Sequence, residues 1–73
     1  MNTVHIYISE ALDNRHVQEL RHDLLDTPWV NDVEINAQSP HDMLVEYQQE
    51  HITPMAILRK LNRYGVHTDV TAC

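Results

Sequence analysis

Hydrophobic and polar residues alternate along four short segments of this chain, as they do in strands that bury one face. The first segment, residues 3–9, sets valine and isoleucine against polar and aromatic positions. The same period of two returns around Val33 and Ile35, over residues 43–48 and over residues 66–71. Each of these four segments is therefore predicted to be a strand.

Between these strands, hydrophobic residues instead recur at helical spacing. Within residues 15–26, Leu20 and Leu24 share one face of a predicted first helix. Asp13 or Asn14 can cap this helix, because either side chain can accept a hydrogen bond from an otherwise unpaired amide of the first turn.

The second helix is predicted mainly from its start signal. Thr53 supplies a capping hydroxyl, and Pro54 takes the first helical position, where the N–H that proline lacks is not needed. Gly65 is well placed as the left-handed residue that ends the helix. The hydrophobic residues at helical spacing in between are Met55, Leu58 and Leu61, with Ile57 and Tyr64 beside them.

The order strand, helix, strand, strand, helix, strand is that of the ferredoxin-like fold. This fold is an α+β sandwich, in which a four-stranded antiparallel sheet of order 4-1-3-2 carries both helices on one face. The 73 residues are expected to form one domain, residues 1–73. The chain has no phenylalanine and a single tryptophan, so mostly aliphatic residues must fill the core, and Trp29 and Val30 are expected to cover its bottom.

The formal net charge of −6 argues against several classes of partner. A polyanion would be repelled at long range, so nucleic acid and anionic membrane surfaces are not expected to bind. A cation or a basic protein surface is expected instead. The first residues lack a basic stretch followed by a long apolar run, so we expect no signal peptide, no membrane insertion and a cytoplasmic location. The one cysteine, Cys73, cannot form an intramolecular disulfide.

Six histidines are the main candidates for chemistry. The predicted topology is expected to gather three connections at one edge of the sheet: those after the first strand, after the third strand and before the fourth. The candidate metal ligands at that edge are Asp13, His16, His51 and His67. His41 and His5 are expected away from it. Imidazole and carboxylate ligands suit zinc, nickel or copper(II), but Asp13 can equally be only a helix cap and the histidines only solvated residues.

The open face of the sheet is the other candidate surface. Its acids surround a lone aromatic residue, which argues against RNA binding, because RNA-binding sheets stack bases on several aromatics among basic residues. The face is either a solvated acidic surface or a docking site for a basic protein patch. Without a nucleophile, base and orienting group in one arrangement, we do not expect an enzyme. By alternation the face carries His5, Tyr7, Asp32, Glu34, Leu44, Glu46 and Asp69.

Several segments together carry a family resemblance. They are residues 4–8, the pair Leu20 and Leu24, the stretch Trp29-Val30-Asn31-Asp32-Val33, and residues 57–66 with the dipeptide Tyr64-Gly65. They resemble the heavy-metal-associated domains, which comprise copper chaperones and the amino-terminal modules of metal-pumping ATPases. The resemblance covers nearly the whole chain and consists mostly of hydrophobic positions.

The family binds copper(I) or zinc through Cys-x-x-Cys between the first strand and the first helix. By the resemblance, that motif falls on Asp13-Asn14-Arg15-His16. Both thiolates are absent, which rules out copper(I) chaperoning by two cysteines. Asp13 and His16 keep ligand chemistry at the two metal-binding positions, and a harder ion such as zinc, nickel or cobalt would suit them better.

Two functions follow from this resemblance. The first is a domain that binds a divalent transition metal through Asp13 and His16, helped by His51 or His67. The second is a domain that keeps the fold without the metal and serves as a protein-interaction or dimerisation module, for example as a homodimer through an exposed edge strand. Regulatory domains of the ACT type share the topology, so a small-ligand sensor is a variant of the second function.

Overall fold

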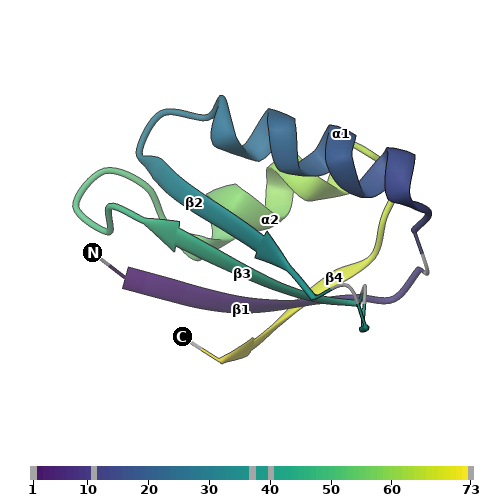
Figure 1. Ribbon diagram of the computed structural model, residues 1–73. Helices are drawn as coiled ribbons and strands as arrows, with labels where there is room; N and C mark the ends of the chain where they lie inside the picture. The colour runs from purple at the N-terminus through teal and green to yellow at the C-terminus, as the bar shows by residue number, and fades with distance from the viewer. Residues whose placement is uncertain (1, 11, 37, 40, 73) are drawn as a thin grey trace.

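Two helices lie on one face of a four-stranded antiparallel sheet in the computed structural model of the chain (Figure 1). The structure describes residues 2–10, 12–36, 38–39 and 41–72, so Cys73 lies outside the described residues. The sheet order β2-β3-β1-β4 is the predicted order read in reverse, which confirms the ferredoxin-like fold. The elements are β1 (Asn2–Ile8), α1 (Asn14–Leu25), β2 (Val30–Ile35), β3 (Asp42–Tyr47), α2 (Pro54–Asn62) and β4 (Thr68–Ala72).

The core lies between the sheet and the helices. Alternation along β1 turns Val4, Ile6 and Ile8 toward the helices, and each of them is at most 1% exposed. Leu20 and Leu24, the predicted inner face of α1, are buried as well. No polar or charged side chain is buried among the residues that the structure describes. The other buried core residues are Val30, Val33, Met43, Val45, Tyr47, Ile57, Leu61 and Val66.

The second helix buries a slightly different face from the predicted one. Ile57 and Leu61 are buried and Leu58 is half-buried, whereas Met55 is 58% exposed. Met55 precedes Ile57 by two residues, which places the two side chains about 200° apart around the helix axis. A helix of this length has room for one buried stripe, and the stripe runs through Ile57 and Leu61.

The predicted end signals of the helices are confirmed. Asp13 caps α1 by accepting a hydrogen bond of 2.9 Å from the His16 amide. Thr53 caps α2 through its hydroxyl, which accepts from the amide of Ala56 at 3.2 Å. Gly65 follows α2 with a φ of 78°, in the left-handed region that glycine enters without steric cost.

Trp29 does not cover the core, contrary to the expectation from the sequence. Val30 takes the inward position at the start of β2 and is 8% exposed, whereas Trp29, just before it, is 49% exposed. The φ of Trp29 is 73°, and no other non-glycine residue in the described part of the chain has a positive φ. For a bulky residue this conformation costs roughly 1–2 kcal/mol.

The free edge of β2 is covered at its centre by side chains. The Nε atom of Arg21, on α1, donates a hydrogen bond to the Val33 carbonyl oxygen at 3.0 Å. The Val33 amide donates to the Oδ1 atom of Asp32 at 2.9 Å. Both polar backbone groups of Val33 are therefore occupied, and the centre of this edge does not offer them to another strand.

Burial sets the expected stability effects in the core. Leu20→Ala should lower the free energy of unfolding by about 2–5 kcal/mol, because it leaves a cavity under α1. Met55→Ala removes a side chain of similar size from an exposed position and should change that free energy by less than about 0.5 kcal/mol. Urea unfolding followed by circular dichroism measures both, and similar losses for the two variants would contradict the assignment of the core.

Candidate functional site

Three connections meet at the end of the sheet where β1 finishes, which we call the loop end. β3 runs antiparallel to β1, with Tyr7 opposite Asp42 and Asn2 opposite Tyr47. The loop end therefore holds the β1–α1 connection, the β2–β3 hairpin and the α2–β4 connection (Figure 1).

Asp13 and His16 form a pair at the start of α1. The Nδ1 atom of His16 lies 2.8 Å from Oδ1 of Asp13, the same oxygen that accepts the His16 amide. Both side chains are largely exposed, at 62% for His16 and 68% for Asp13. Because Nδ1 is engaged by the carboxylate, Nε2 is the nitrogen of His16 that remains for another partner.

Glu10 and His67 form a second pair of the same kind. The Nδ1 atom of His67 lies 2.9 Å from Oε2 of Glu10, and the His67 amide donates to Oε1 at 2.8 Å. The backbone supports this pair, since the Ser9 amide donates to the His67 carbonyl at 2.9 Å. Glu10 thus ties the end of β1 to the start of β4 and leaves Nε2 as the nitrogen of His67 that remains for another partner.

Glu10 is a residue of this end that the sequence patterns do not single out. The feature that could reveal the contact between Glu10 and His67 is the pairing of the first and last strands. This pairing sets Ile8 opposite Thr68, so the residues just beyond these two, Glu10 and His67, come together. Predicting this contact needs the strand register, which alternation alone does not supply.

Both carboxylates of these pairs are held in their charged form. The backbone amide of His16, with a further contribution from its ring, lowers the pKa of Asp13 below its ordinary value. The amide and ring of His67 lower the pKa of Glu10 in the same order of importance. In each case donors that favour the anion outweigh the small loss of solvation.

His41 also lies at the loop end, where the sequence did not place it. Its Nδ1 atom lies 2.6 Å from the Ile8 carbonyl oxygen, and its ring stacks on Tyr7 with centroids 5.5 Å apart. The prediction that His41 sits at the opposite end is wrong, because the β2–β3 hairpin precedes a strand antiparallel to β1.

His51 is the converse case, and its predicted position beside Asp13 and His16 is wrong. β3 ends opposite the start of β1, so the β3–α2 connection that carries His51 is at the other end of the molecule. There the His51 ring stacks on Trp29, with centroids 3.9 Å apart and an angle of 20° between the planes.

No preformed metal centre is present among the described residues of the loop end. Among residues 2–10, 12–36, 38–39 and 41–72, no three histidine, cysteine, aspartate or glutamate side chains are grouped so that they could hold a metal ion. Of the four candidate ligands, Asp13 and His16 are in contact, and His67 lies in another connection at the same end, paired with Glu10.

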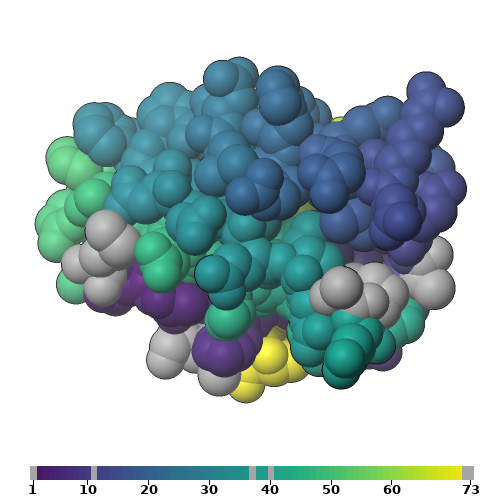
Figure 2. Space-filling model, viewed as in Figure 1, coloured from purple at the N-terminus to yellow at the C-terminus, as the bar shows by residue number. Residues whose placement is uncertain are grey.

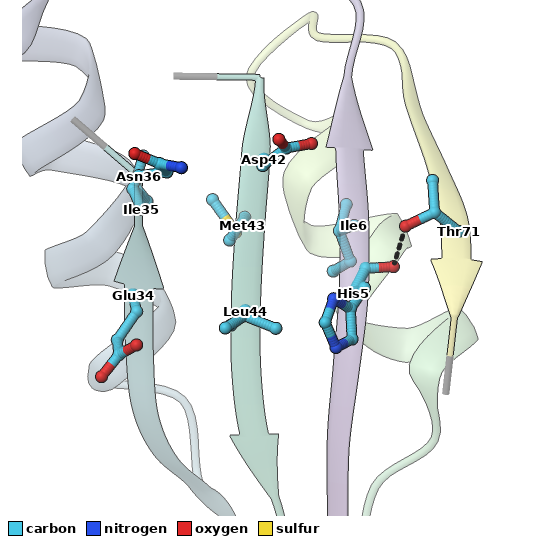
Figure 3. A pocket seen from close by; sticks show the side chains of 9 residues that line it. All are labelled: His5, Ile6, Glu34, Ile35, Asn36, Asp42, Met43, Leu44 and Thr71. Carbon is cyan, nitrogen blue, oxygen red and sulfur yellow. Dashed lines mark hydrogen bonds between the residues drawn. The ribbon is translucent and has the colours of Figure 1, made fainter. Parts of the chain in front are cut away.

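The open face of the sheet carries charge of one sign. The strands contain five carboxylates and no lysine or arginine, and Asp32 lies directly opposite Glu46. Glu34, Leu44 and His5 form a row across three strands, and they line a shallow depression of about 480 Å³ (Figure 3). The five acids are Asp32, Glu34, Asp42, Glu46 and Asp69.

Comparison with known proteins identifies the fold. No protein-family model matches the chain, and no curated protein matches it. Among solved structures, a copper-binding domain of the P-type ATPase HMA7 superposes with a TM-score of 0.88 at 10% identity, covering 99% of this chain and 96% of that one. The yeast copper transporter domain CCC2A, solved in apo and Cu(I)-loaded states, gives 0.84 at 14% identity, with 96% and 94% covered.

A third similar structure is oxidised MerP from Ralstonia metallidurans, with a TM-score of 0.84 at 10% identity and 96% of each chain covered. At such identities the likeness establishes a shared fold. The chain therefore has the fold of the heavy-metal-associated domains, as the resemblance predicted. In the described part of the chain, no helix has the length and apolar character needed to cross a membrane.

The lowered pKa of Asp13 gives a prediction for acid stability. A carboxylate whose pKa is lowered by folding stabilises the fold at every pH above its ordinary pKa. This contribution is lost as the pH falls through the lowered pKa. Asp13→Asn keeps a capping side chain that does not titrate. Wild-type protein should exceed this variant in urea midpoint at pH 7, and the difference should shrink as the pH falls below the ordinary pKa of an aspartate. A pH-independent difference would contradict the lowered pKa, and Asp13→Ala, without a cap, should be the less stable variant at neutral and at acid pH.

Proposed function

We propose that this domain binds a divalent transition-metal ion at the loop end, with Asp13 and His16 as its first ligands and His67 as a further one. The observation that carries the proposal is the 2.8 Å contact between Asp13 and the Nδ1 atom of His16 at the start of α1. These two residues occupy the positions that the resemblance assigns to the metal ligands. The structural neighbours support it too, because one is a copper-binding domain and another was solved in a Cu(I)-loaded state.

The geometry of the two pairs suits a metal ligand. Metal-binding histidines commonly use one ring nitrogen for the metal and donate from the other to a carboxylate, which fixes the tautomer and raises the basicity of the ligand. His67 has Glu10 in this role. Asp13 and His16 would instead share the ion, which would take the place of the proton between the His16 Nδ1 atom and the Asp13 carboxylate. The net charge of −6 adds a long-range attraction for cations.

The ligand types favour certain metals. Imidazole nitrogen and carboxylate oxygen suit zinc, nickel, cobalt or copper(II), whereas copper(I) prefers thiolates. Two or three protein ligands leave coordination positions for water or for a group of a partner, unlike the closed four-ligand sites that serve structure. This openness favours a domain that receives and releases its ion over one that keeps it. His51 has no part in the site, because it lies at the other end of the molecule.

The second candidate function is a protein-interaction module without metal. The observation that favours it is the open face of the sheet, whose five carboxylates have no lysine or arginine among them. Like charges directly opposite each other, such as Asp32 and Glu46, destabilise a sheet, and a basic partner surface would relieve this repulsion. The β4 edge offers a route to a homodimer by strand addition.

Titration with zinc, followed by NMR and calorimetry and reversed with a chelator, tests the proposal. We expect one ion per chain, micromolar or tighter affinity, and shifts concentrated at Asp13, His16 and His67. His16→Gln should weaken binding by about tenfold or more, since it removes a direct ligand. Parallel titrations with nickel, cobalt and copper(II) would rank the metals.

The matched control is His22→Gln, which removes an exposed histidine from the same helix. It should leave the affinity unchanged. Equal weakening by His16→Gln and His22→Gln, or shifts spread over all six histidines at millimolar zinc, would mean adventitious binding and would favour the interaction module.

A further inference from the structure

Trp29 combines a strained backbone with an exposed ring. Its φ of 73° lies in the left-handed region, where a large side chain is unfavourable, and the residue is 49% exposed. A core tryptophan could offset such strain by burial, but half of this side chain remains in water. A strained residue that stability does not explain is a reason to look for a function.

The surroundings hold Trp29 in this conformation. Its carbonyl oxygen accepts the Gln48 amide at 2.8 Å, which joins the α1–β2 turn to the β3–α2 loop. The Val30 amide donates to the Thr27 carbonyl at 3.2 Å, and the His51 amide donates to the Gln48 carbonyl at 3.0 Å. The two segments adjoin on the molecular surface, at the left of Figure 2.

The His51 ring packs on the indole of Trp29. The two rings stack with centroids 3.9 Å apart and planes inclined by 20°. We call this pair the Trp29–His51 platform. An aromatic ring that is already immobilised loses little conformational freedom when a ligand packs on it, which is the general advantage of preorganisation.

The two segments that carry the platform hold charge of one sign. The segments 26–30 and 48–53 contain two carboxylates, Asp26 and Glu50, and no lysine or arginine. Both carboxylates are exposed. An indole with carboxylates beside it suits a cationic side chain, and a guanidinium suits it better than an ammonium, because the planar group can stack on the ring and also pair with a carboxylate.

We infer that the Trp29–His51 platform is a recognition site for an arginine side chain presented by a partner protein. The guanidinium would pack against the exposed part of the Trp29 indole, and Asp26 and Glu50 would supply the attracting charge. This site lies at the opposite end of the molecule from the proposed metal ligands and does not depend on them. The domain would then have one end for an ion and the other for a protein.

Trp29 is the only tryptophan, so its fluorescence and its indole N–H resonance report on this site directly. The probes are two blocked peptides of equal charge, Gly-Arg-Gly-Arg-Gly and Gly-Lys-Gly-Lys-Gly. The arginine peptide should shift the indole resonance and change the fluorescence saturably, with an affinity about threefold or more above that of the lysine peptide. Equal affinities, or no saturable change, would overturn the inference.

Two single variants separate a local site from the general acidity of the chain. Glu50→Gln should weaken binding of the arginine peptide. Glu19→Gln removes the same charge from an exposed position in α1, outside the platform, and should leave that binding nearly unchanged. Equal weakening by both variants would mean that only the net charge acts, and would overturn the site.

Trp29→Gly tests whether the indole ring at this strained backbone position is needed for stability. Glycine adopts a φ of 73° freely, so the variant should unfold at close to the wild-type urea concentration, as followed by circular dichroism. A large drop in the midpoint would show that the ring is kept for stability, against the inference.

Discussion

The antiparallel pairing of β1 with both of its neighbours is the constraint on which the rest of the structure depends. β1 pairs with β3 on one side and with β4 on the other, so its direction decides which connections share an end of the sheet. It brings Glu10 to His67 and the Ile8 carbonyl to His41, although these partners are far apart in the sequence. The same pairing sends His51 to the opposite end.

The carboxylates at the loop end accept hydrogen bonds from backbone amides and so stabilise the fold without any ligand. Asp13 satisfies an amide at the start of α1, and Glu10 satisfies an amide at the start of β4. The same contacts orient two imidazoles, so a cation that bound them would find the rings already turned. Binding and folding would then be linked, because an ion held only by the folded chain stabilises it.

The order of elements, the sheet order and the helix caps could be predicted from the sequence, because alternation, helical spacing and capping chemistry are local signals. Asp13, Thr53 and Gly65 all act as their residue types indicate. The positions of His41 and His51 could not be read from periodicity, which assigns a residue to a face but not to an end. The crossover helix returns the chain to the start of β1 and the hairpin then reverses it, so β3 begins where β1 finishes.

The covered edge of β2 has a consequence for how copies of this chain could associate. Arg21 and Asp32 occupy the backbone groups of Val33, and β4 forms the other edge of the sheet. A sheet with two open edges can add chains without limit, and such growth leads to fibres. With one edge blocked at its centre, pairing along β4 around a two-fold axis uses the remaining edge of both copies. Growth would then stop at two chains, which protects a small domain with an open sheet from polymerising.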